Sequence, residues 1–252
     1  MTNATLSSWN DLIDLLISFE GFETKTAYDM YGIPTLGHGF ALIILAQKNP
    51  AIWQIRSDIN LRFGEAGMPL LNQAGLNVLL ACAADLTAGK KNIRDLTPIG
   101  ITITRQQARV LVESHVRELA AQVSSRLTNA WDTLGWAKRG GLLQWLYVRG
   151  IGALTQELQN EWRQGHFFKV ADDIVKNSPK VIASRSKLAA NLIAYGSFDR
   201  HGFYSVRPGD TLGSIAAHLR LTQQALLDAN GALKVNPHKL SIGQELKLPV
   251  VA

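Results

Sequence analysis

The chain has 252 residues, of which 46% are hydrophobic and 18% charged, so it can bury a large core and does not have the composition of a disordered protein. Its 26 basic residues outnumber its 20 acidic ones, giving a net charge of +6, which favours an anionic polymer as a partner. The basic residues are scattered and no nucleic-acid motif accompanies them, so we expect no nucleic-acid partner. No apolar run reaches membrane-spanning length, and we expect no membrane insertion.

The first predicted helix precedes a turn-rich segment. Apolar residues recur at steps of three and four, as on one face of an amphipathic helix: Trp9, Leu12, Ile13, Leu16 and Phe19. Ser7 or Ser8 is placed to cap its start, and Glu20 stands at its C-terminal end. Glycines and a proline then interrupt residues with strand preference between positions 31 and 39, which predicts a short twisted hairpin.

Glu20 and Asp29 are two carboxylates at the edges of these elements. Cleavage of a glycosidic bond needs such a pair, because one carboxyl donates a proton to the leaving oxygen while the other stays ionised and activates water or attacks the sugar. Glu20 has apolar neighbours and Asp29 polar ones, as those two roles require. From these residues alone, a surface Glu and an Asp that caps the hairpin turn are an equally good interpretation.

The spacing between the two carboxylates adds a resemblance. Glu-Gly at 20–21, Ala-Tyr-Asp at 27–29 and Gly-x-x-Thr-Leu-Gly-x-Gly at 32–39 together resemble the active-site signature of phage-type lysozymes. The resemblance implies an α+β domain that is mostly helical with a small β-hairpin lobe. It also implies an inverting muramidase, needing no metal or cofactor, that cuts the β-1,4 bond between N-acetylmuramic acid and N-acetylglucosamine. By the same resemblance, Glu20 is the general acid, and Asp29 with Thr35 holds the attacking water.

The chain departs from this family at two places. Phe40 stands where the family closes its signature with a histidine, while His38 falls between two glycines, and Val148 replaces a polar residue expected near the cleft. Further along, Ser184-Arg-Ser-Lys matches the closing Arg-x-Lys element of the family. That match implies that Arg185 stands near Glu20 and orients it, the alternative being a solvated helix residue.

The segment from about 41 to 100 is longer than the family pattern and predicts an enlargement of the lobe beside the cleft. Residues 41–46 fit either a continuation of the hairpin or a new helix. Asn49-Pro50 predicts a stop, followed by a helix through Trp53 and Ile55. Cys82 lies in an apolar helical run, where we expect a buried structural thiol.

Beyond this segment, Thr104 and Gln107 have the spacing of a capping box at the start of a long amphipathic helix. Further helices then complete a first domain, predicted at 1–198. A short linker is predicted at 199–202.

The composition changes after the linker, and a compact unit is predicted at 203–252. An alternating strand, two helices and a closing strand indicate a small βααβ module. Tyr204-x-Val206-x-x-Gly-Asp-Thr-Leu, then Leu226-x-x-Ala-Asn, then Gly243-Gln-x-Leu-x-Leu-Pro closely resemble a LysM domain. The resemblance implies binding of N-acetylglucosamine-containing glycans such as peptidoglycan or chitin. The positions implied in sugar contact are Gly209, Asp210, Thr211, Leu212, Asn236, Pro237 and His238.

The two resemblances point to one polymer, and they predict a peptidoglycan hydrolase of the endolysin type for bacterial cell lysis or wall penetration. One alternative is a catalytically degenerate structural or adaptor protein of a phage tail or contractile secretion machine, suggested by Phe40 and Val148. Another is an amidase or endopeptidase, which would need zinc ligands or a Cys/His pair.

The start of the chain bears on delivery. No Lys or Arg precedes Lys25, and Asp11 and Asp14 interrupt the first apolar stretch, unlike a secretory signal peptide. We therefore expect a chain that is made in the cytoplasm and delivered to the periplasm or the cell exterior by a holin or a secretion machine. We also expect it to be a monomer. A holin, an immunity protein or the secretion machinery would be its protein partner.

Overall fold

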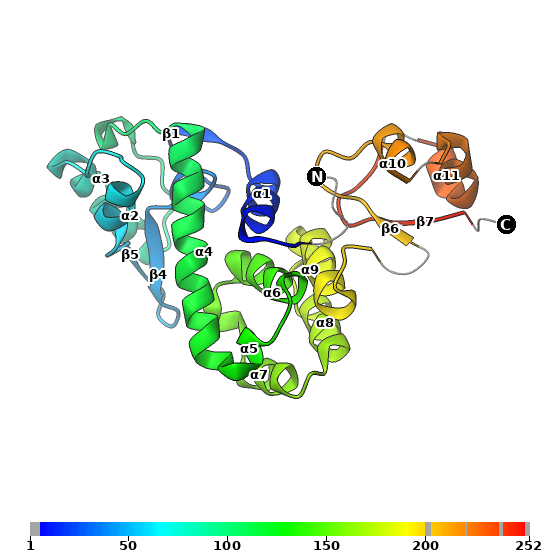
Figure 1. Ribbon diagram of the computed structural model, residues 1–252. Coiled ribbons are helices and arrows are strands. Elements are labelled where there is room, and N and C mark those ends of the chain that lie inside the picture. Colours follow the sequence, from blue (N-terminus) through cyan, green and yellow to red (C-terminus); the bar gives the residue numbers. More distant parts are fainter. Residues whose placement is uncertain (1–5, 200–202, 220, 237–238, 250–252) are drawn as a thin grey trace. The chain divides into compact units, whose positions relative to one another are not determined.

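The computed structural model describes residues 6–199, 203–219, 221–236 and 239–249. The chain forms two compact units, one of residues 16–117, which we call the sheet unit, and one of residues 1–15 and 118–252, which we call the helical unit. The boundaries between the units fall inside two helices, α1 (Trp9–Phe19) and α4 (Arg105–Leu127) (Figure 1). Of the linker predicted at 199–202, residues 200–202 lie outside the described part.

The sheet unit contains two antiparallel sheets and short helices. Its first sheet has the strand order β1-β2-β3, and its second pairs β4 with β5. The elements are β1 (Glu23–Tyr28), β2 (Pro34–Gly37), β3 (Phe40–Ala41), β4 (Ile43–Gln47), β5 (Ile52–Ile55), α2 (Ile59–Glu65), α3 (Gln73–Thr87) and the 3-10 helix η1 (Thr97–Ile99). The hairpin predicted after α1 is confirmed, β3 adds a third strand to its sheet, and β4 begins the second sheet.

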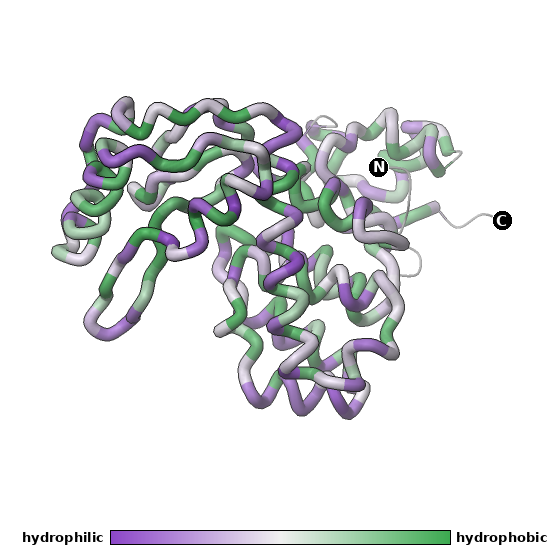
Figure 2. The backbone as a smooth tube through the Cα atoms, turned by 60° about the vertical axis from the view of Figure 1, so that its left-hand side comes forward, coloured by the Kyte–Doolittle hydropathy of each residue, from purple (hydrophilic) through white to green (hydrophobic). Residues whose placement is uncertain are grey.

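The helix predicted through Trp53 and Ile55 is wrong, because this stretch is strand β5. Its side chains alternate in exposure, and the two partly buried ones, Trp53 and Ile55, pack against the core of the sheet unit. This two-residue alternation in exposure is that of a strand with one face against a core. The tip of the β4–β5 hairpin is hydrophilic and extends from the body of its unit (Figure 2).

The core of the sheet unit joins the first hairpin to the segment that follows it. Phe40 is 7% exposed and lies 6.4 Å from Phe63, ring centroid to ring centroid. The guanidinium of Arg56 lies 4.7 Å from the centroid of the Phe40 ring. Cys82 is a free, buried thiol in the same cluster, as predicted. Burial raises the pKa of this thiol, which keeps it in the unreactive protonated form.

The predicted helix starts are confirmed by their caps. The hydroxyl of Ser8 accepts a hydrogen bond from the backbone N–H of Asp11 at 3.2 Å, at the start of α1. At the start of α4, Thr104 and Gln107 exchange backbone-to-side-chain hydrogen bonds of 2.9 and 3.2 Å. Such reciprocal bonds satisfy amides that a helix start otherwise leaves unpaired.

The helical unit consists of packed helices followed by the predicted βααβ module. Its helices before the module are α5 (Asn129–Asp132), α6 (Trp136–Arg149), η2 (Ile151–Ala153), α7 (Gln156–Arg163), α8 (Phe167–Lys176), η3 (Lys180–Ile182) and α9 (Ala183–Tyr195). The module contains β6 (Phe203–Ser205), α10 (Leu212–Leu219), α11 (Gln223–Ala229), η4 (Gly231–Lys234) and β7 (Glu245–Lys247). Strands β6 and β7 are antiparallel and enclose a separate hydrophobic core. The expected α+β class is confirmed.

The module contacts α9 through polar groups. Arg207, whose side chain is 2% exposed, pairs with Asp199 at 2.6 Å. Its guanidinium lies 5.3 Å from the centroid of the Phe198 ring and 4.5 Å from that of the Tyr204 ring. The side-chain amide of Asn191 in α9 donates to the carbonyl of Phe198 and to the hydroxyl of Ser205. These contacts fix the start of the module on the last helix before it.

Replacing Asp199 by Ala should lower the free energy of unfolding by about 3 to 5 kcal/mol, because the guanidinium of Arg207 then stays buried without its counter-charge. Asp228→Ala is the matched control, since Asp228 pairs with Lys234 at 2.7 Å on the surface, where both side chains are about half exposed. That control should hardly change stability. Urea unfolding of the full chain measures both variants, and equal effects would contradict the assigned role of the buried pair.

Candidate active site

Glu20 lies directly after α1 and against the turn between β2 and β3. Its backbone N–H donates to the carbonyl of Ile17 at 3.1 Å, which ends the helix. A Cβ placed on Gly39 would stand 3.7 Å from Oε2 of Glu20, so the carboxyl lies over this glycine. Gly39 has a φ of +79°, a conformation that glycine adopts without strain. The glycine lets the turn pass close beneath the carboxyl.

His38 supports the same turn. Its Nδ1 lies 2.8 Å from the carbonyl oxygen of Gly21, the residue after Glu20, and its side chain is buried. The ring centroid of Phe22 is 5.2 Å from that of His38. The sequence showed this histidine displaced from the family position, and the structure shows that it ties the end of α1 to the β2–β3 turn.

Asp29 holds the turn between β1 and β2. Its Oδ1 accepts hydrogen bonds from the backbone N–H groups of Tyr31 at 2.8 Å and Ile33 at 2.9 Å. Its own N–H donates to the carbonyl of Ile33 at 3.0 Å, which extends the ladder beyond the two strands. The turn-capping role considered from the sequence is therefore present. It involves Oδ1 and leaves Oδ2 outside these two bonds.

Thr35 lies in β2, with 9% of its surface exposed. Its hydroxyl donates to the carbonyl of Ala27 in the neighbouring strand at 3.3 Å. A hydroxyl has one proton and two lone pairs. Because this bond uses the proton, Oγ1 of Thr35 remains able to accept a hydrogen bond.

The strand register brings Asp29 and Thr35 to one face of the sheet. Ala27 pairs directly with Thr35, and Asp29 follows two residues later. Side chains two residues apart on a strand share a face, so Asp29 is the diagonal neighbour of Thr35, at a spacing of about 7–8 Å between such residues. The register thus directs Asp29 and Thr35 to the same side of the hairpin, and the carboxyl of Glu20 lies against the turn that follows β2.

Arg185 lies in α9 of the helical unit, whereas Glu20 belongs to the sheet unit. The guanidinium of Arg185 lies 5.7 Å from the centroid of the Tyr147 ring. Val148 follows that tyrosine and is 39% exposed. Orientation of Glu20 by Arg185 stays a prediction.

The glycan positions predicted in the module divide into structural and surface groups. Oδ2 of Asp210 accepts from the hydroxyl of Tyr204 at 3.0 Å and from the N–H of Arg207 at 2.7 Å, and Leu212 is buried in the core. Thr211 exchanges capping bonds with Ser214 at the start of α10. These three residues shape the loop before α10.

The other predicted glycan positions lie at the surface or outside the described residues. Gly209 has a φ of +82°, with open space around the position of a Cβ. Asn236 is exposed. Pro237 and His238 lie outside the described residues. A contact with glycan at Gly209 would therefore use its backbone.

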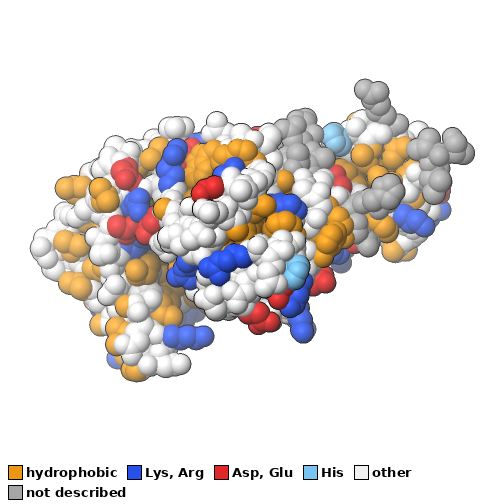
Figure 3. All heavy atoms as spheres, turned by 60° about the horizontal axis from the view of Figure 1, so that its bottom comes forward, with side chains coloured by type: hydrophobic (Ala, Val, Ile, Leu, Met, Phe, Trp, Pro, Cys, Tyr) orange, Lys and Arg blue, Asp and Glu red, His pale blue; other side chains and the backbone are white. Residues whose placement is uncertain are grey.

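Three further features bear on partners: the distribution of basic side chains, the apolar character of the helices and the grouping of metal-binding side chains. On the face drawn in Figure 3, Lys and Arg side chains are spread among neutral and acidic ones. No helix within the described ranges combines the length and apolar character that crossing a bilayer requires. Among those same residues, no three His, Cys, Asp or Glu side chains gather as a metal-binding group.

Replacement of Asp29 should separate its turn-capping role from its charge. Asp29→Asn keeps an oxygen that can accept both backbone bonds, so we expect a free energy of unfolding close to that of the parent. Asp29→Ala loses both bonds, and we expect a loss of about 2 kcal/mol. Chemical unfolding of the two variants provides the measurement. A destabilised Asn variant together with a stable Ala variant would contradict the turn-capping role.

Comparisons with known proteins identify the C-terminal module. The LysM domain model matches residues 204–249. The "Intracellular hyphae protein 1" of Colletotrichum lindemuthianum is 46% identical over 61 residues, which make up 24% of this chain and 26% of that protein. A Bacillus licheniformis protein named as an L,D-transpeptidase, YkuD, is 52% identical over 46 residues, or 18% of this chain and 27% of that protein. The chain thus spans about a quarter of the length of these curated relatives.

Among solved structures, the endolysin from Escherichia coli O157:H7 phage FAHEc1 is similar with a TM-score of 0.48 and 17% sequence identity, over 79% of this chain and 100% of that one. At that level of similarity, the catalytic assignment depends on the site itself. The module is matched directly by its sequence. Residues 204–249 therefore form a LysM domain, a domain that binds peptidoglycan.

Proposed function

We propose that this protein is a muramidase that cleaves the β-1,4 bond between N-acetylmuramic acid and N-acetylglucosamine in peptidoglycan, and that its LysM domain holds it on the wall. The observation that carries the proposal is the hydrogen-bonding state of Asp29 and Thr35. Each is fixed by a backbone partner, and each has an acceptor left over on the same face of the sheet.

Two acceptors on one side of the hairpin suit a water molecule held between them. A water that donates one O–H to Oδ2 of Asp29 and the other to Oγ1 of Thr35 keeps a lone pair free for attack. As its oxygen bonds to the anomeric carbon, Asp29 takes up one of its protons. Thr35 alone has no comparable basicity, and Asp29 alone would leave the water free to turn. The pair therefore supplies both base and orientation.

Glu20 supplies the proton for the other side of the bond. In its protonated form it donates to the glycosidic oxygen as the bond from that oxygen to the anomeric carbon breaks, and the leaving sugar departs as an alcohol. Its carboxyl lies over Gly39 of the β2–β3 turn. The contact of His38 with the carbonyl of Gly21 ties that turn to the residue after Glu20. Both protons are thus accounted for, and no covalent intermediate is needed.

The LysM domain supports the same substrate. A second binding site on one chain raises the effective concentration of the catalytic site near an insoluble polymer, even when each contact is weak. The net charge of +6 acts in the same direction, because the wall carries anionic groups. Within this proposal the protein works after delivery to the wall, by a holin or by a secretion machine.

A structural or adaptor role in a phage tail or contractile secretion machine is the alternative function. Phe40 and Val148 are the departures that suggested it; Phe40 packs in the core beside Phe63, whereas Val148 is 39% exposed. An adaptor would bind purified peptidoglycan through LysM without releasing reducing ends. Measuring binding and release on the same preparation separates the two functions.

Glu20→Gln should lower the rate of peptidoglycan hydrolysis by at least about 100-fold, because the amide keeps the shape of the side chain but cannot supply the proton. The measurement is the release of reducing ends from purified, insoluble peptidoglycan. Glu157→Gln, at an exposed position in α7, is the matched control and should keep the rate of the parent. Activity of Glu20→Gln within a few-fold of the parent would remove Glu20 from the mechanism.

The anomer released first reports how water attacks. If Asp29 and Thr35 hold water on the face opposite Glu20, hydrolysis of the β-linked glycan should give the α-anomer, and the two carboxyls should stand about 6.5 to 9.5 Å apart in the working site. Proton NMR during the first minutes of hydrolysis, before mutarotation, shows which anomer forms. The β-anomer, or a glycosyl-enzyme trapped on Asp29, would overturn the inverting mechanism while leaving the muramidase function in place.

A further inference from the structure

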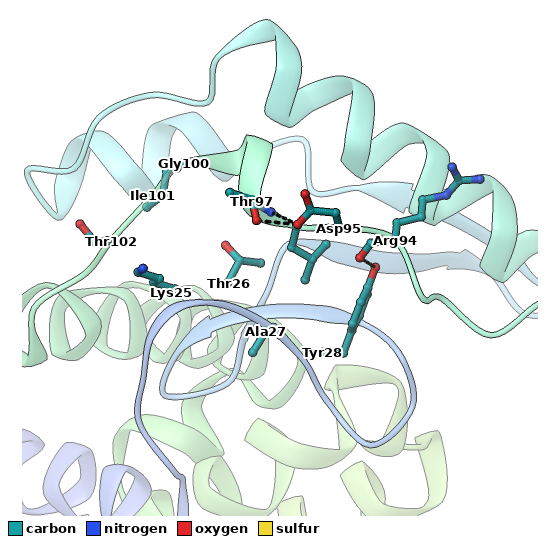
Figure 4. Close-up of a pocket in the computed structure, with 11 residues that line it drawn as sticks. Lys25, Thr26, Ala27, Tyr28, Arg94, Asp95, Thr97, Gly100, Ile101 and Thr102 are labelled. Atoms are coloured by element: carbon teal, nitrogen blue, oxygen red, sulfur yellow. Dashed lines mark hydrogen bonds between the residues drawn. The ribbon is translucent and has the colours of Figure 1, made fainter.

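A pocket of about 560 Å³ opens beside β1 in the sheet unit, outside the site described above. One wall is the strand from Lys25 to Tyr28, and the other is the segment 94–102 that surrounds η1 (Figure 4). Neither the proposed acid nor the proposed water-binding pair lines it. It nonetheless begins one residue before Asp29, because Tyr28 is one of its lining residues.

The pocket opens where the segment 94–102 separates from one edge of β1. One edge of β1 pairs with β2, and the other meets the chain at a bridge between Lys25 and Thr102 and at a 2.9 Å bond from the N–H of Ile103 to the carbonyl of Thr24. The two segments then separate. They meet again where the hydroxyl of Tyr28 donates to the carbonyl of Arg94 at 3.0 Å.

Strand β1 is irregular where it passes the pocket, because its register with β2 shifts between Glu23 and Ala27, as at a β-bulge. The stretch from Lys25 to Tyr28 is about 10 Å long at the usual rise per strand residue. Two or three residues of an extended peptide fit that length.

Thr26 also directs a side-chain group into this space. Its hydroxyl oxygen is buried and has no hydrogen-bond partner among the described residues. Figure 4 shows the side chain between the two walls of the pocket. A buried polar atom without a partner is uncommon in folded proteins and needs a reason. A ligand that carries an amide would give this hydroxyl its partner.

The two walls carry opposite charges. The ammonium of Lys25 lies on the strand side, while Asp95 lies on the opposite wall beside Thr97 (Figure 4). Hydrogen bonds from the side chain and the backbone of Thr97 lower the pKa of Asp95 and keep it ionised. The guanidinium of Arg94 is directed away from the pocket and pairs with Asp85 at 2.6 Å. A ligand with both a carboxylate and an amine matches this distribution.

We propose that this pocket binds the peptide stem of peptidoglycan, a short peptide with free carboxylates and, on its dibasic residue, an amine. The stem lies in the pocket beside β1, with a carboxylate on Lys25, an amide at the hydroxyl of Thr26 and its methyl groups against Leu96 and Ile101. A neutral sugar would leave both charges without partners. The inference rests on the proposed function, because the stem branches from the sugar whose bond is cut close by.

The test is calorimetric titration of full-length protein carrying Glu20→Gln, which prevents turnover, with the free stem tetrapeptide of the diaminopimelate type. This peptide contains no sugar, so the LysM domain does not contribute to the signal. We expect Lys25→Ala and Thr26→Val each to weaken its binding about five- to tenfold. Lys91→Ala is the matched control, since Lys91 is an exposed lysine that does not line the pocket, and it should bind the peptide like the parent.

Thermal unfolding tells a binding role of Thr26 from a structural one. Thr26→Val removes a buried hydroxyl without a partner and keeps the shape of the side chain, so the melting temperature should stay the same or rise while peptide binding weakens. A fall in melting temperature with unchanged peptide binding would overturn the role of Thr26.

Two further results would overturn the proposal as a whole. One is the absence of peptide binding to the parent, and the other is binding of chitotetraose that depends on Lys25 and Thr26 while peptide binding does not. None of these titrations requires hydrolysis. A protein that binds the stem but cuts no glycan would contradict the muramidase function alone, and one that cuts glycan but does not bind the stem would contradict this inference alone.

Discussion

The hydrogen bonds that Asp29 accepts from the N–H groups of Tyr31 and Ile33 are the constraint on which the candidate site depends. They close the turn between β1 and β2, and this turn sets the register that places Thr35 opposite Ala27. A shift of one residue would send the hydroxyl of Thr35 to the other face of the sheet. The carboxylate that organises the turn is also the proposed base. Its two oxygens allow this, since one is used by the backbone and the other remains for water.

The sequence predicted this part of the fold well because its signals are local. Caps, apolar spacing and turn residues all lie within a few positions of the elements that they define, as Ser8 and Asp11 do at the start of α1. The strand at 52–55 was missed because Asn49-Pro50 was interpreted as a stop followed by a helix, whereas Trp53 and Ile55 alternate with exposed neighbours in a strand. A stretch of four residues, three of them apolar, fits both periods, and only its packing against the core decides between them.

Contacts between distant segments account for what the sequence did not predict. The pocket beside β1 depends on where the segment near Thr102 stops pairing with β1. No sequence pattern in either segment predicts where that pairing ends. The buried pair of Arg207 and Asp199 spans the predicted linker and was likewise not visible. Within the LysM domain, Asp210 was predicted as a sugar contact, and the structure shows its carboxylate accepting bonds from Tyr204 and Arg207. A motif residue can thus be present because it shapes a loop.

The departure from the lysozyme signature at Phe40 has a physical explanation in the segment that follows it. Phe40 is buried against Phe63 and beneath Arg56, both of which belong to that segment. A histidine there would place a polar ring among apolar neighbours, at a cost that only a hydrogen-bond partner offsets. His38 takes over the support of the β2–β3 turn from the other side, through the carbonyl of Gly21. The same segment carries Asp95 and Leu96, which form the far wall of the pocket beside β1. Segment 41–100 therefore supplies the apolar partner of Phe40 and the far wall of a pocket that begins one residue from the proposed base.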